Sequence, residues 1–268
     1  MTPQTDFVPR NKWVVVAMLW FICFFNYADR QAIFAIFPVL EKEFQFDKAE
    51  LGLIGAAFTW VYAMTAPFAG VVADKYPRKL VILGGLLVWS VVTGFTSFCS
   101  KVWHFVVVRG AEGLGETFYF PASMSLVSDY HSQTTRSRAM SLHQTSVYAG
   151  TVGGSVFAGW MADRYGWQSS FYVLGALGVV LALVLWRFLR EPPRNAAERL
   201  ERGETEAAET MPFGVFLKEI ARTPSALLLI TAFFGANSVA MVFLTWMPTF
   251  LKEKFQLTLA LAGFNATF

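Results

Sequence analysis

Apolar residues fall into long runs along this chain, separated by short polar segments. Each run approaches the ~20 residues that an α-helix needs to cross the hydrocarbon core of a bilayer. The strict apolar–polar alternation of barrel strands is absent from these runs. The pattern predicts an all-α membrane protein with six complete spans, a seventh after a charged gap and the start of an eighth. The last run stops at Phe268 without a polar tail, so we expect a fragment of a longer protein. The expected spans are 13–37, 51–73, 80–98, 102–128, 138–162, 168–189, 224–250 and 259–268.

The composition agrees with this prediction and excludes other classes of protein. Of the 268 residues, 55% are apolar, 15% are charged and 27 are phenylalanine, whereas soluble domains carry about 25% charged residues. The mean hydropathy is +0.45. A disordered chain, a disulfide scaffold and an ordinary soluble enzyme are therefore excluded. The net charge of +3 does not indicate a nucleic-acid partner, because the basic residues lie between the apolar runs rather than along one face.

The distribution of basic residues predicts the orientation in the membrane. Loops rich in Lys and Arg stay in the cytoplasm, and most of the 22 basic residues fall in loops on the side of the N-terminus. We therefore expect a multi-pass protein whose N-terminus is cytoplasmic. The first run is longer than the core of a signal peptide and carries charges, so we interpret it as a span.

One charged segment interrupts the series of short loops. Residues 190–211 read REPPRNAAERLERGETEAAETM, which we interpret as a solvated cytoplasmic tether between two bundles. Phe213, Phe216, Leu217 and Ile220 then follow the i, i+3, i+4, i+7 spacing of an amphipathic helix lying on the membrane surface. The expected domains are a six-helix bundle over 1–189, a linker over 190–223 and the start of a second bundle over 224–268.

A short motif, Gly-x-x-x-Asp-(Lys/Arg)-Tyr, occurs at the ends of two spans. The copies are residues 70–76 and 159–165, and the expected topology places them on opposite sides of the membrane. Such inverted repeats are typical of secondary transporters. In the first copy, Asp74 can accept a hydrogen bond from a neighbouring helix N-terminus or pair with a basic residue. We expect this loop to latch one conformation through Gly70, Asp74, Lys75, Arg78 and Lys79.

Five ionisable residues lie inside two of the expected spans. Asp29 and Arg30 are in the first span, while Arg109, Glu112 and Glu116 share one face of the fourth. A charge at the bilayer centre costs at least about 2.5–3.5 kcal/mol, so we expect the five to line one cavity. Their sum is −1 when all are ionised. Uptake of a proton by one carboxylate would free an arginine to bind an anion, which links proton and anion binding.

An alternative interpretation is that these charges form an ion-pair network that only fixes helix packing. It applies most strongly to Glu112, which lies close enough to pair with Arg109. Hydroxyl and amide groups in the spans are further candidates for substrate contacts. These candidates are Tyr27, Tyr119 and Gln144.

Motifs of enzymes and pumps are absent from the sequence. There is no Walker-type loop, no nucleophile elbow and no His-Glu-x-x-His, and the three histidines lack the spacing of metal ligands. We therefore predict no catalytic activity, no cofactor and no metal site. Cys23 and Cys99 lie in apolar runs and are interpreted as packing residues.

The loop after the second span resembles the signature of the major facilitator superfamily. It departs from that signature at Pro77, where the family usually has glycine. Arg109, Gly113 and Gly115 are similar to the second motif of the superfamily. The resemblance implies twelve helices in two six-helix bundles, of which this chain supplies the first bundle and the start of the second.

Four further motifs resemble the anion:cation symporter family within that superfamily. They are Asn-Tyr-x-Asp-Arg at 26–30, Gly-Leu-Gly-Glu at 113–116, Phe-Pro-Ala at 120–122 and Trp-Met-Pro-Thr-Phe at 246–250. Bacterial members import sugar acids with protons, which implies a bacterial inner-membrane protein that acts as a monomer on a small organic anion. The resemblance further implies proton coupling through Asp29 and Glu116, and substrate binding through Arg30 and Arg109. Thr117 departs from the alanine that is common in the family.

The first two of these motifs also resemble the Spinster-like family, which handles lysolipids and sphingolipids. A lysolipid or sphingolipid transporter is therefore an alternative function. A membrane-embedded enzyme, a sensor and a fragment that transports nothing are further alternatives. The sequence leaves open the identity of the substrate, coupling to protons or sodium, the stoichiometry, the direction of transport and the oligomeric state.

Overall fold

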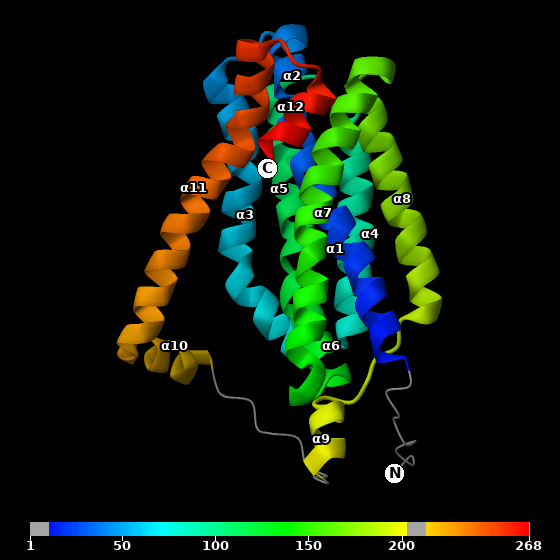
Figure 1. Ribbon diagram of the computed structural model, residues 1–268, viewed down its shortest axis with the longest axis vertical. Coiled ribbons are helices and arrows are strands. Elements are labelled where there is room, and N and C mark those ends of the chain that lie inside the picture. Colours follow the sequence, from blue (N-terminus) through cyan, green and yellow to red (C-terminus); the bar gives the residue numbers. More distant parts are fainter. Residues whose placement is uncertain (1–10, 203–212, 268) are drawn as a thin grey trace.

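The structure, a computed structural model, describes residues 11–202 and 213–267, and the regular elements in these ranges are all α-helices (Figure 1). This confirms the predicted all-α class. The helices are α1 (Lys12–Ala35), α2 (Phe37–Phe44), α3 (Lys48–Lys75), α4 (Arg78–Thr96), α5 (Val102–Thr117), α6 (Tyr119–Tyr130), α7 (Gln133–Tyr165), α8 (Trp167–Phe188), α9 (Ala196–Arg202), α10 (Phe213–Arg222), α11 (Pro224–Phe255) and α12 (Leu259–Ala266).

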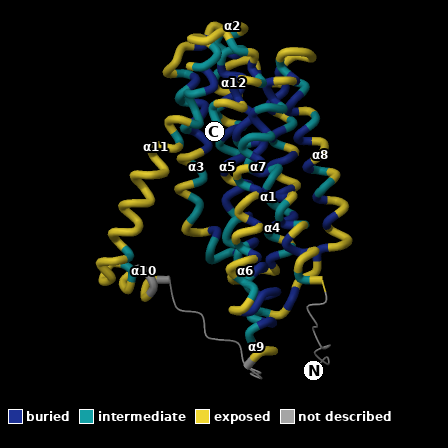
Figure 2. Tube along the Cα trace, viewed as in Figure 1, coloured by how far each residue is buried: buried dark blue, intermediate teal, exposed yellow. Residues whose placement is uncertain are grey.

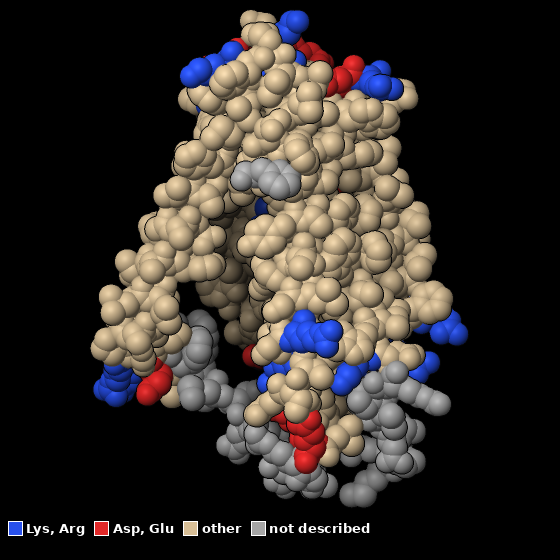
Figure 3. Space-filling view, viewed as in Figure 1, with Lys and Arg blue, Asp and Glu red and all other residues tan. Residues whose placement is uncertain are grey.

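Helices α1 and α3 to α8 pack side by side as one elongated bundle (Figure 1). Buried residues line its middle, and exposed residues cover its outer surface and most of α11 (Figure 2). On the face shown in Figure 3, most of the visible charged side chains lie near the two ends of the molecule. Within the described residues, α1, α3, α4, α8 and α11 are long and apolar enough to cross a membrane. We call the end that carries α2 the hairpin end, and the opposite end, near α9 and α10, the linker end.

Two of the expected spans are not continuous helices. The span expected over 102–128 is divided at Phe118, because Pro121 lacks the N–H that would bond the carbonyl of Thr117. The first span likewise ends at Ala35, and the chain continues as the short helix α2, which has a proline in its first turn. Each of these two expected spans is therefore interrupted in the structure.

Glycines allow the long helix α7 to pack closely against α1. A Cβ atom added at Gly154 would overlap the backbone of Ala28, and one at Gly150 would overlap the carbonyl oxygen of Phe24. Only residues without a side chain permit this approach of two backbones. The close packing of α7 against α1 therefore depends on these two glycines.

Helix α11 leans against the bundle only near the hairpin end (Figure 1). There Trp246 lies with its ring centroid 5.9 Å from that of Phe37, and the Gln31 side chain donates to the carbonyl of Leu244 at 3.0 Å. Toward the linker end, α11 diverges from α3 and its residues are exposed. A hollow of about 1010 Å³ lies between these two helices.

The first part of the linker is docked on the bundle, which corrects the interpretation of a solvated tether. Arg194 donates to the carbonyl of Ala73 at 2.9 Å, and Glu198 pairs with Arg136 at 3.0 Å. The unexpected helix α9 begins at Ala196, which is buried. Residues 203–212 lie outside the described residues. The expected amphipathic helix is present as α10, although the side chains of Phe213, Phe216 and Leu217 also lie outside the description.

Candidate functional site

Arg30 in α1 and Glu116 in α5 form an ion pair inside the bundle. The guanidinium approaches one oxygen of the carboxylate with Nη2 at 2.8 Å and Nε at 3.2 Å. The Glu116 side chain is completely enclosed, whereas 20% of the Arg30 side chain stays exposed. The rings of Tyr27, Phe58 and Tyr62 surround the guanidinium, with centroids 4.6–5.1 Å from its central carbon. Arg30 is therefore held by one carboxylate and three aromatic rings.

A second ion pair, between Arg109 and Glu112, lies one turn away on α5. The hydroxyl of Thr96 donates to Glu112 at 3.3 Å. Phe58 also contacts this arginine, with its ring centroid 4.7 Å from the guanidinium carbon. The same ring therefore lies between Arg30 and Arg109. Two nitrogen atoms of Arg109, Nε and Nη2, are buried and have no hydrogen-bond partner among the residues that the structure describes.

Asp29 is the third carboxylate of the cluster, and no basic side chain among the described residues forms an ion pair with it. Its side chain is buried, and within residues 11–202 and 213–267 neither carboxylate oxygen has a hydrogen-bond donor. Glu112, Glu116 and Arg109 all lie within electrostatic range of Asp29. The structure thus brings together the five ionisable residues that were expected to share a cavity. Each arginine pairs with one glutamate, and Asp29 is not part of either pair.

The other predicted substrate contacts are separated by the structure. Tyr27 lies beside Arg30. Tyr119 is buried in the bundle, and its hydroxyl bonds to the carbonyl of Leu19 at 2.7 Å and to His143 Nε2 at 2.8 Å. Gln144 is exposed on α7. Of these three candidates, only Tyr27 is brought to the charge cluster in this conformation.

The contacts of Phe58 and His143 were not expected from the sequence, whereas Tyr62 was a weaker candidate for lining the cavity. Phe58 and Tyr62 reach Arg30 from α3, and their i, i+4 spacing on an expected span was the available signal. His143 was considered only as a metal ligand, yet it contacts Tyr119. No group of three or more potential metal ligands occurs in the part of the chain that the structure describes.

The loop after α3, which was expected to act as a latch, has the expected pairing at Asp74 but a different arrangement of its basic residues. Gly70 has open space around its α-carbon, and Lys75 is exposed. Asp74 pairs with Arg194 of the linker at 3.7 Å, which is the expected pairing with a base. Lys79 donates its backbone N–H to Glu191 at 2.7 Å.

Arg78 is buried rather than exposed on the inner face. It pairs with Asp129 at the end of α6 and with Glu191 at 2.7 Å, and it donates to the carbonyl of Pro192 at 2.9 Å. Asp129 directly follows the expected fourth span, and no motif in the sequence indicates that it pairs with Arg78.

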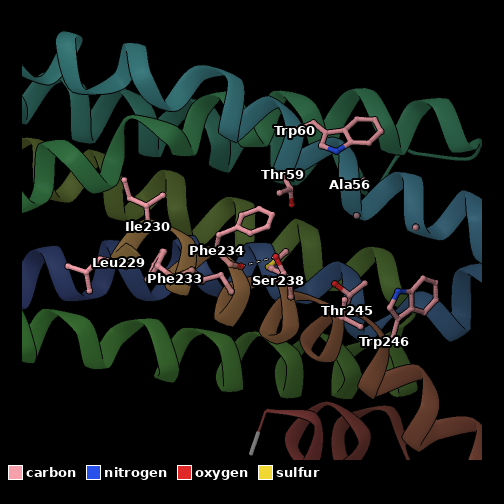
Figure 4. Close-up of a pocket in the computed structure, with 15 residues that line it drawn as sticks. Ala56, Thr59, Trp60, Leu229, Ile230, Phe233, Phe234, Ser238, Thr245 and Trp246 are labelled. Atoms are coloured by element: carbon pink, nitrogen blue, oxygen red, sulfur yellow. Dashed lines mark hydrogen bonds between the residues drawn. The ribbon is translucent and has the colours of Figure 1, made fainter. Parts of the chain in front are cut away.

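An apolar cavity lies on the other face of α3. Its volume is about 1010 Å³, and α3 contributes Thr59 and Trp60 while α11 contributes Phe233, Phe234 and Trp246 (Figure 4). Asn237, Ser238 and Thr245 supply polar groups to its α11 side. Helix α3 therefore contacts the charge cluster through Phe58 and the apolar cavity through its neighbours.

Comparison with known proteins places this geometry in a family. A sequence model described as the Major Facilitator Superfamily matches residues 19–268, nearly the whole chain. The chain belongs to the major facilitator superfamily. The membership predicted from the loop motif and the second motif is confirmed. Members of this superfamily are membrane transporters, so this chain is an integral membrane protein of a transporter family.

Relatives of two kinds match this superfamily member. Human protein spinster homolog 1 is 31% identical over 250 residues, which cover 92% of this chain and 47% of that protein. Probable anion transporter 4, chloroplastic, of Oryza sativa subsp. japonica is 31% identical over 263 residues, covering 92% and 44%. Ascorbate transporter, chloroplastic, of Arabidopsis thaliana is 29% identical over 271 residues, covering 96% and 49%. The chain spans about half the length of the curated relatives it matches.

A solved structure shares the fold. It is the crystal structure of a bacterial homolog to the human lysosomal transporter Spinster, in an inward-facing and unoccupied conformation. The TM-score is 0.78 at 23% identity, over 95% of this chain and 58% of that chain. The major facilitator fold predicted from the motifs is confirmed.

Proposed function

We propose that the protein is a secondary transporter that moves a small organic anion, such as a sugar acid, together with protons by alternating access. The observation that carries this proposal is the cluster of three carboxylates and two guanidinium groups in α1 and α5, in which every member except the partly exposed Arg30 is buried. Each arginine is bound by one glutamate, and Asp29 accepts no hydrogen bond. One negative charge of the cluster is therefore not neutralised.

Asp29 and Glu116 would be the proton carriers. An ionised carboxylate enclosed without a donor is unfavourable, so a proton on Asp29 removes the excess charge. A proton on Glu116 would weaken its pair with Arg30 and release the guanidinium. Both residues lie in the helices that also carry the arginines, so proton binding acts directly on the anion site.

Arg30 and Arg109 would bind the anion. Nε and Nη2 of Arg30 both point to Glu116, and this edge of a guanidinium fits a carboxylate in bidentate geometry. Arg109 has two unpaired nitrogens for a second contact. Because the anion replaces a glutamate on the arginine, protonation and anion binding favour each other, which is the linkage that symport needs.

The remaining assignments belong to the same proposal. The hydroxyl of Tyr27 would hydrogen-bond the substrate beside Arg30, while Tyr119 and Gln144 are weaker candidates. We place the linker end with its Asp74 loop in the cytoplasm, as the basic residues of the loops favour. The protein would act as a monomer in the bacterial inner membrane. The anion transporter of rice and the ascorbate transporter of Arabidopsis support an organic anion as substrate.

A second candidate function is transport of a lysolipid. The observation that favours it is the apolar cavity of about 1010 Å³ between α3 and α11, whose lining includes Phe233, Phe234 and Trp60. A hydrocarbon chain fits such a lining better than a sugar acid does. The similarity to human protein spinster homolog 1 also supports this candidate.

Uptake into proteoliposomes under an imposed proton gradient distinguishes the two functions. A panel of labelled sugar acids and a labelled lysolipid would be tested with the parent protein and with Asp29→Asn, Arg30→Lys and Arg30→Gln. Arg164→Gln, which removes an exposed arginine far from the cluster, is the matched control. We expect proton-driven uptake of a sugar acid that the Asp29 and Arg30 variants lose and the control keeps.

Each outcome decides between the candidates. Lysolipid movement without uptake of any sugar acid would reject the symport proposal and favour the second function. Uptake that survives in Asp29→Asn and still follows the proton gradient would reject Asp29 as a proton carrier. Equal uptake by Arg30→Lys and the parent would show that bidentate binding at Arg30 is not needed.

A further inference from the structure

The second copy of the repeated motif contacts the first turn of α12. Asp163, near the end of α7, accepts a hydrogen bond from the backbone N–H of Leu259 at 3.1 Å. Thr258 accepts from the N–H of Leu261 at 3.3 Å. The first N–H groups of a helix have no partner inside it. The N–H of Leu261 is therefore bonded by Thr258, the residue just before α12. The N–H of Leu259 is bonded by Asp163, a side chain from a different helix.

The glycine of the same motif lets α7 and α12 approach each other. A Cβ added at Gly159 would lie 2.6–2.7 Å from backbone atoms of Leu259 and Ala260. One turn along, a Cβ at Gly263 would lie 2.5 Å from the hydroxyl of Ser155. The two helices thus cross through small residues, an arrangement that allows close contact in membranes. Gly159 and Asp163 are one turn apart, so they act on the same helix end.

The first copy of the motif is not engaged in this way. A Cβ built on Gly70 would have no atom of another described element within 4 Å. The Asp74 side chain is 62% exposed, and among the described residues its ionic partner is Arg194. The two copies therefore stand in different states: the copy at the hairpin end holds a helix terminus, and the copy at the linker end holds none of the described ones.

Other contacts between the first six spans and the segment after the linker lie at the same hairpin end. Lys48 at the start of α3 pairs with Glu41 at 2.7 Å and with Glu253 of α11 at 2.6 Å. Gln31 donates to the carbonyl of Leu244. At the linker end α11 stands apart from the bundle (Figure 1). The contact between α7 and α12 thus belongs to the closed end of the structure.

We propose that Asp163 is a positioning residue that latches α12 onto α7 and keeps the hairpin end closed, with Gly159 providing the close approach. Opening of this end requires the carboxylate to release the N–H of Leu259. This inference rests on the proposed transport function, because a latch affects transport only if the two units move apart. Asp163 contacts no substrate in this scheme and acts on the balance between open and closed states.

Distance measurements between spin labels test the latch without any substrate. Nitroxide labels would be attached at Arg164→Cys in α7 and Lys254→Cys in α11, both of which are exposed at the hairpin end. The distance between the two labels would be measured by pulsed electron paramagnetic resonance in nanodiscs. Cys23 and Cys99 are free but buried, so background labelling is low. The variants are Asp163→Ala, Asp163→Asn and Gly159→Ala, with Asp74→Asn as the matched control at the other copy.

We expect one short distance in the parent and a second, longer distance in the variants. Loss of a capping side chain typically changes a helix equilibrium by about fivefold, so the ratio of long to short distances should rise about fivefold in Asp163→Ala. The ratio should rise less in Asp163→Asn. It should also rise in Gly159→Ala, because the added Cβ would overlap the backbone of α12. Asp74→Asn should not raise the ratio, because the first copy holds none of the described helix ends in the closed state.

An unchanged ratio in both Asp163→Ala and Gly159→Ala would overturn the latch, as would an equal shift in Asp74→Asn. Gly159→Ala keeps the test informative if Asp163→Ala fails to fold. The uptake assay is read separately on the same variants. Absence of transport in the parent, together with shifted distances, would reject the transport proposal and not the latch. Normal transport with unshifted distances would reject the latch alone.

Discussion

Arg78 and Asp129 form an ion pair at the linker end of the bundle that is almost completely enclosed, with 2% and 3% of their side chains exposed. Glu191 and the carbonyl of Pro192 complete the surroundings of the guanidinium. The second carboxylate oxygen of Asp129 accepts from the backbone N–H of Asn195 at 2.6 Å. This network fixes the start of the linker on α4 and α6.

Removal of Arg78 should destabilise the protein strongly. Arg78→Ala leaves the charge of Asp129 enclosed without a cation, which typically costs about 3–5 kcal/mol. Arg78→Lys should cost less, because it keeps the charge, although its single nitrogen cannot take the place of the three guanidinium nitrogens that contact Asp129, Glu191 and Pro192. Lys75→Ala, in the same loop but exposed, should stay within about 0.5 kcal/mol. Denaturant unfolding in micelles measures these differences, and equal stability of Arg78→Ala and Lys75→Ala would contradict the network.

A side chain at Gly154 should force α1 and α7 apart. Gly154→Ala places a Cβ on the backbone of Ala28, and overpacking of this kind costs about 1–3 kcal/mol. Gly84→Ala is the matched control, because Gly84 is also inside a helix but has no atom within 4 Å of the added Cβ. That variant should be neutral or more stable by about 0.5–1 kcal/mol. Thermal unfolding of the two variants compares them directly.

Asp29 and Asp129 should respond oppositely to conversion to asparagine. Asp29 is buried with no hydrogen bond to its carboxylate, so Asp29→Asn removes an uncompensated charge and should leave stability unchanged or higher. Asp129→Asn weakens the pair with Arg78 and should lower stability. Proton-driven uptake should be lost in Asp29→Asn despite its stability. Marked destabilisation of Asp29→Asn would show that this carboxylate has a partner in the membrane.

Stability should fall as the pH drops below about 6.5. His131, between α6 and α7, bonds to Thr135 at 3.1 Å and lies 3.4 Å from the carbonyl of Lys12. Desolvation lowers the pKa of its ring below the ordinary value of 6.5. The unfolded chain then binds a proton more readily, so stability is lost as pH falls from about 6.5 through the lower pKa of the folded state.

A pair of histidine variants isolates this effect. His131→Asn removes the titrating ring and should flatten the dependence of melting temperature on pH between 6.5 and 5. His104→Asn, at an exposed position, should keep the slope of the parent. If His131→Asn and the parent share the same slope, another group causes the dependence.

The hydrophobic pattern alone determined where the helices lie. Each expected span contains helical residues, because the bilayer requires runs of apolar residues whose backbone groups bond within the segment. The repeated glycine and aspartate motif and the five membrane charges were likewise visible as spacings. The i, i+3, i+7 placement of Arg109, Glu112 and Glu116 fixed their common face on one helix. Even the break before Tyr119 had a local signal in Pro121.

The tertiary structure decided which partner each charge has. Arg30 lies 86 residues from Glu116 in sequence, and Arg78 lies 113 from Glu191, so no periodicity within a helix relates them. The packing of α1 against its neighbours pairs both arginines with glutamates. The Asp29 carboxylate therefore has no hydrogen-bond donor among the described residues. Asp163 meets Leu259 only because two glycines let α7 and α12 cross closely. Periodicity records which face of a helix is buried, whereas the choice of partner depends on how separate helices are positioned in three dimensions.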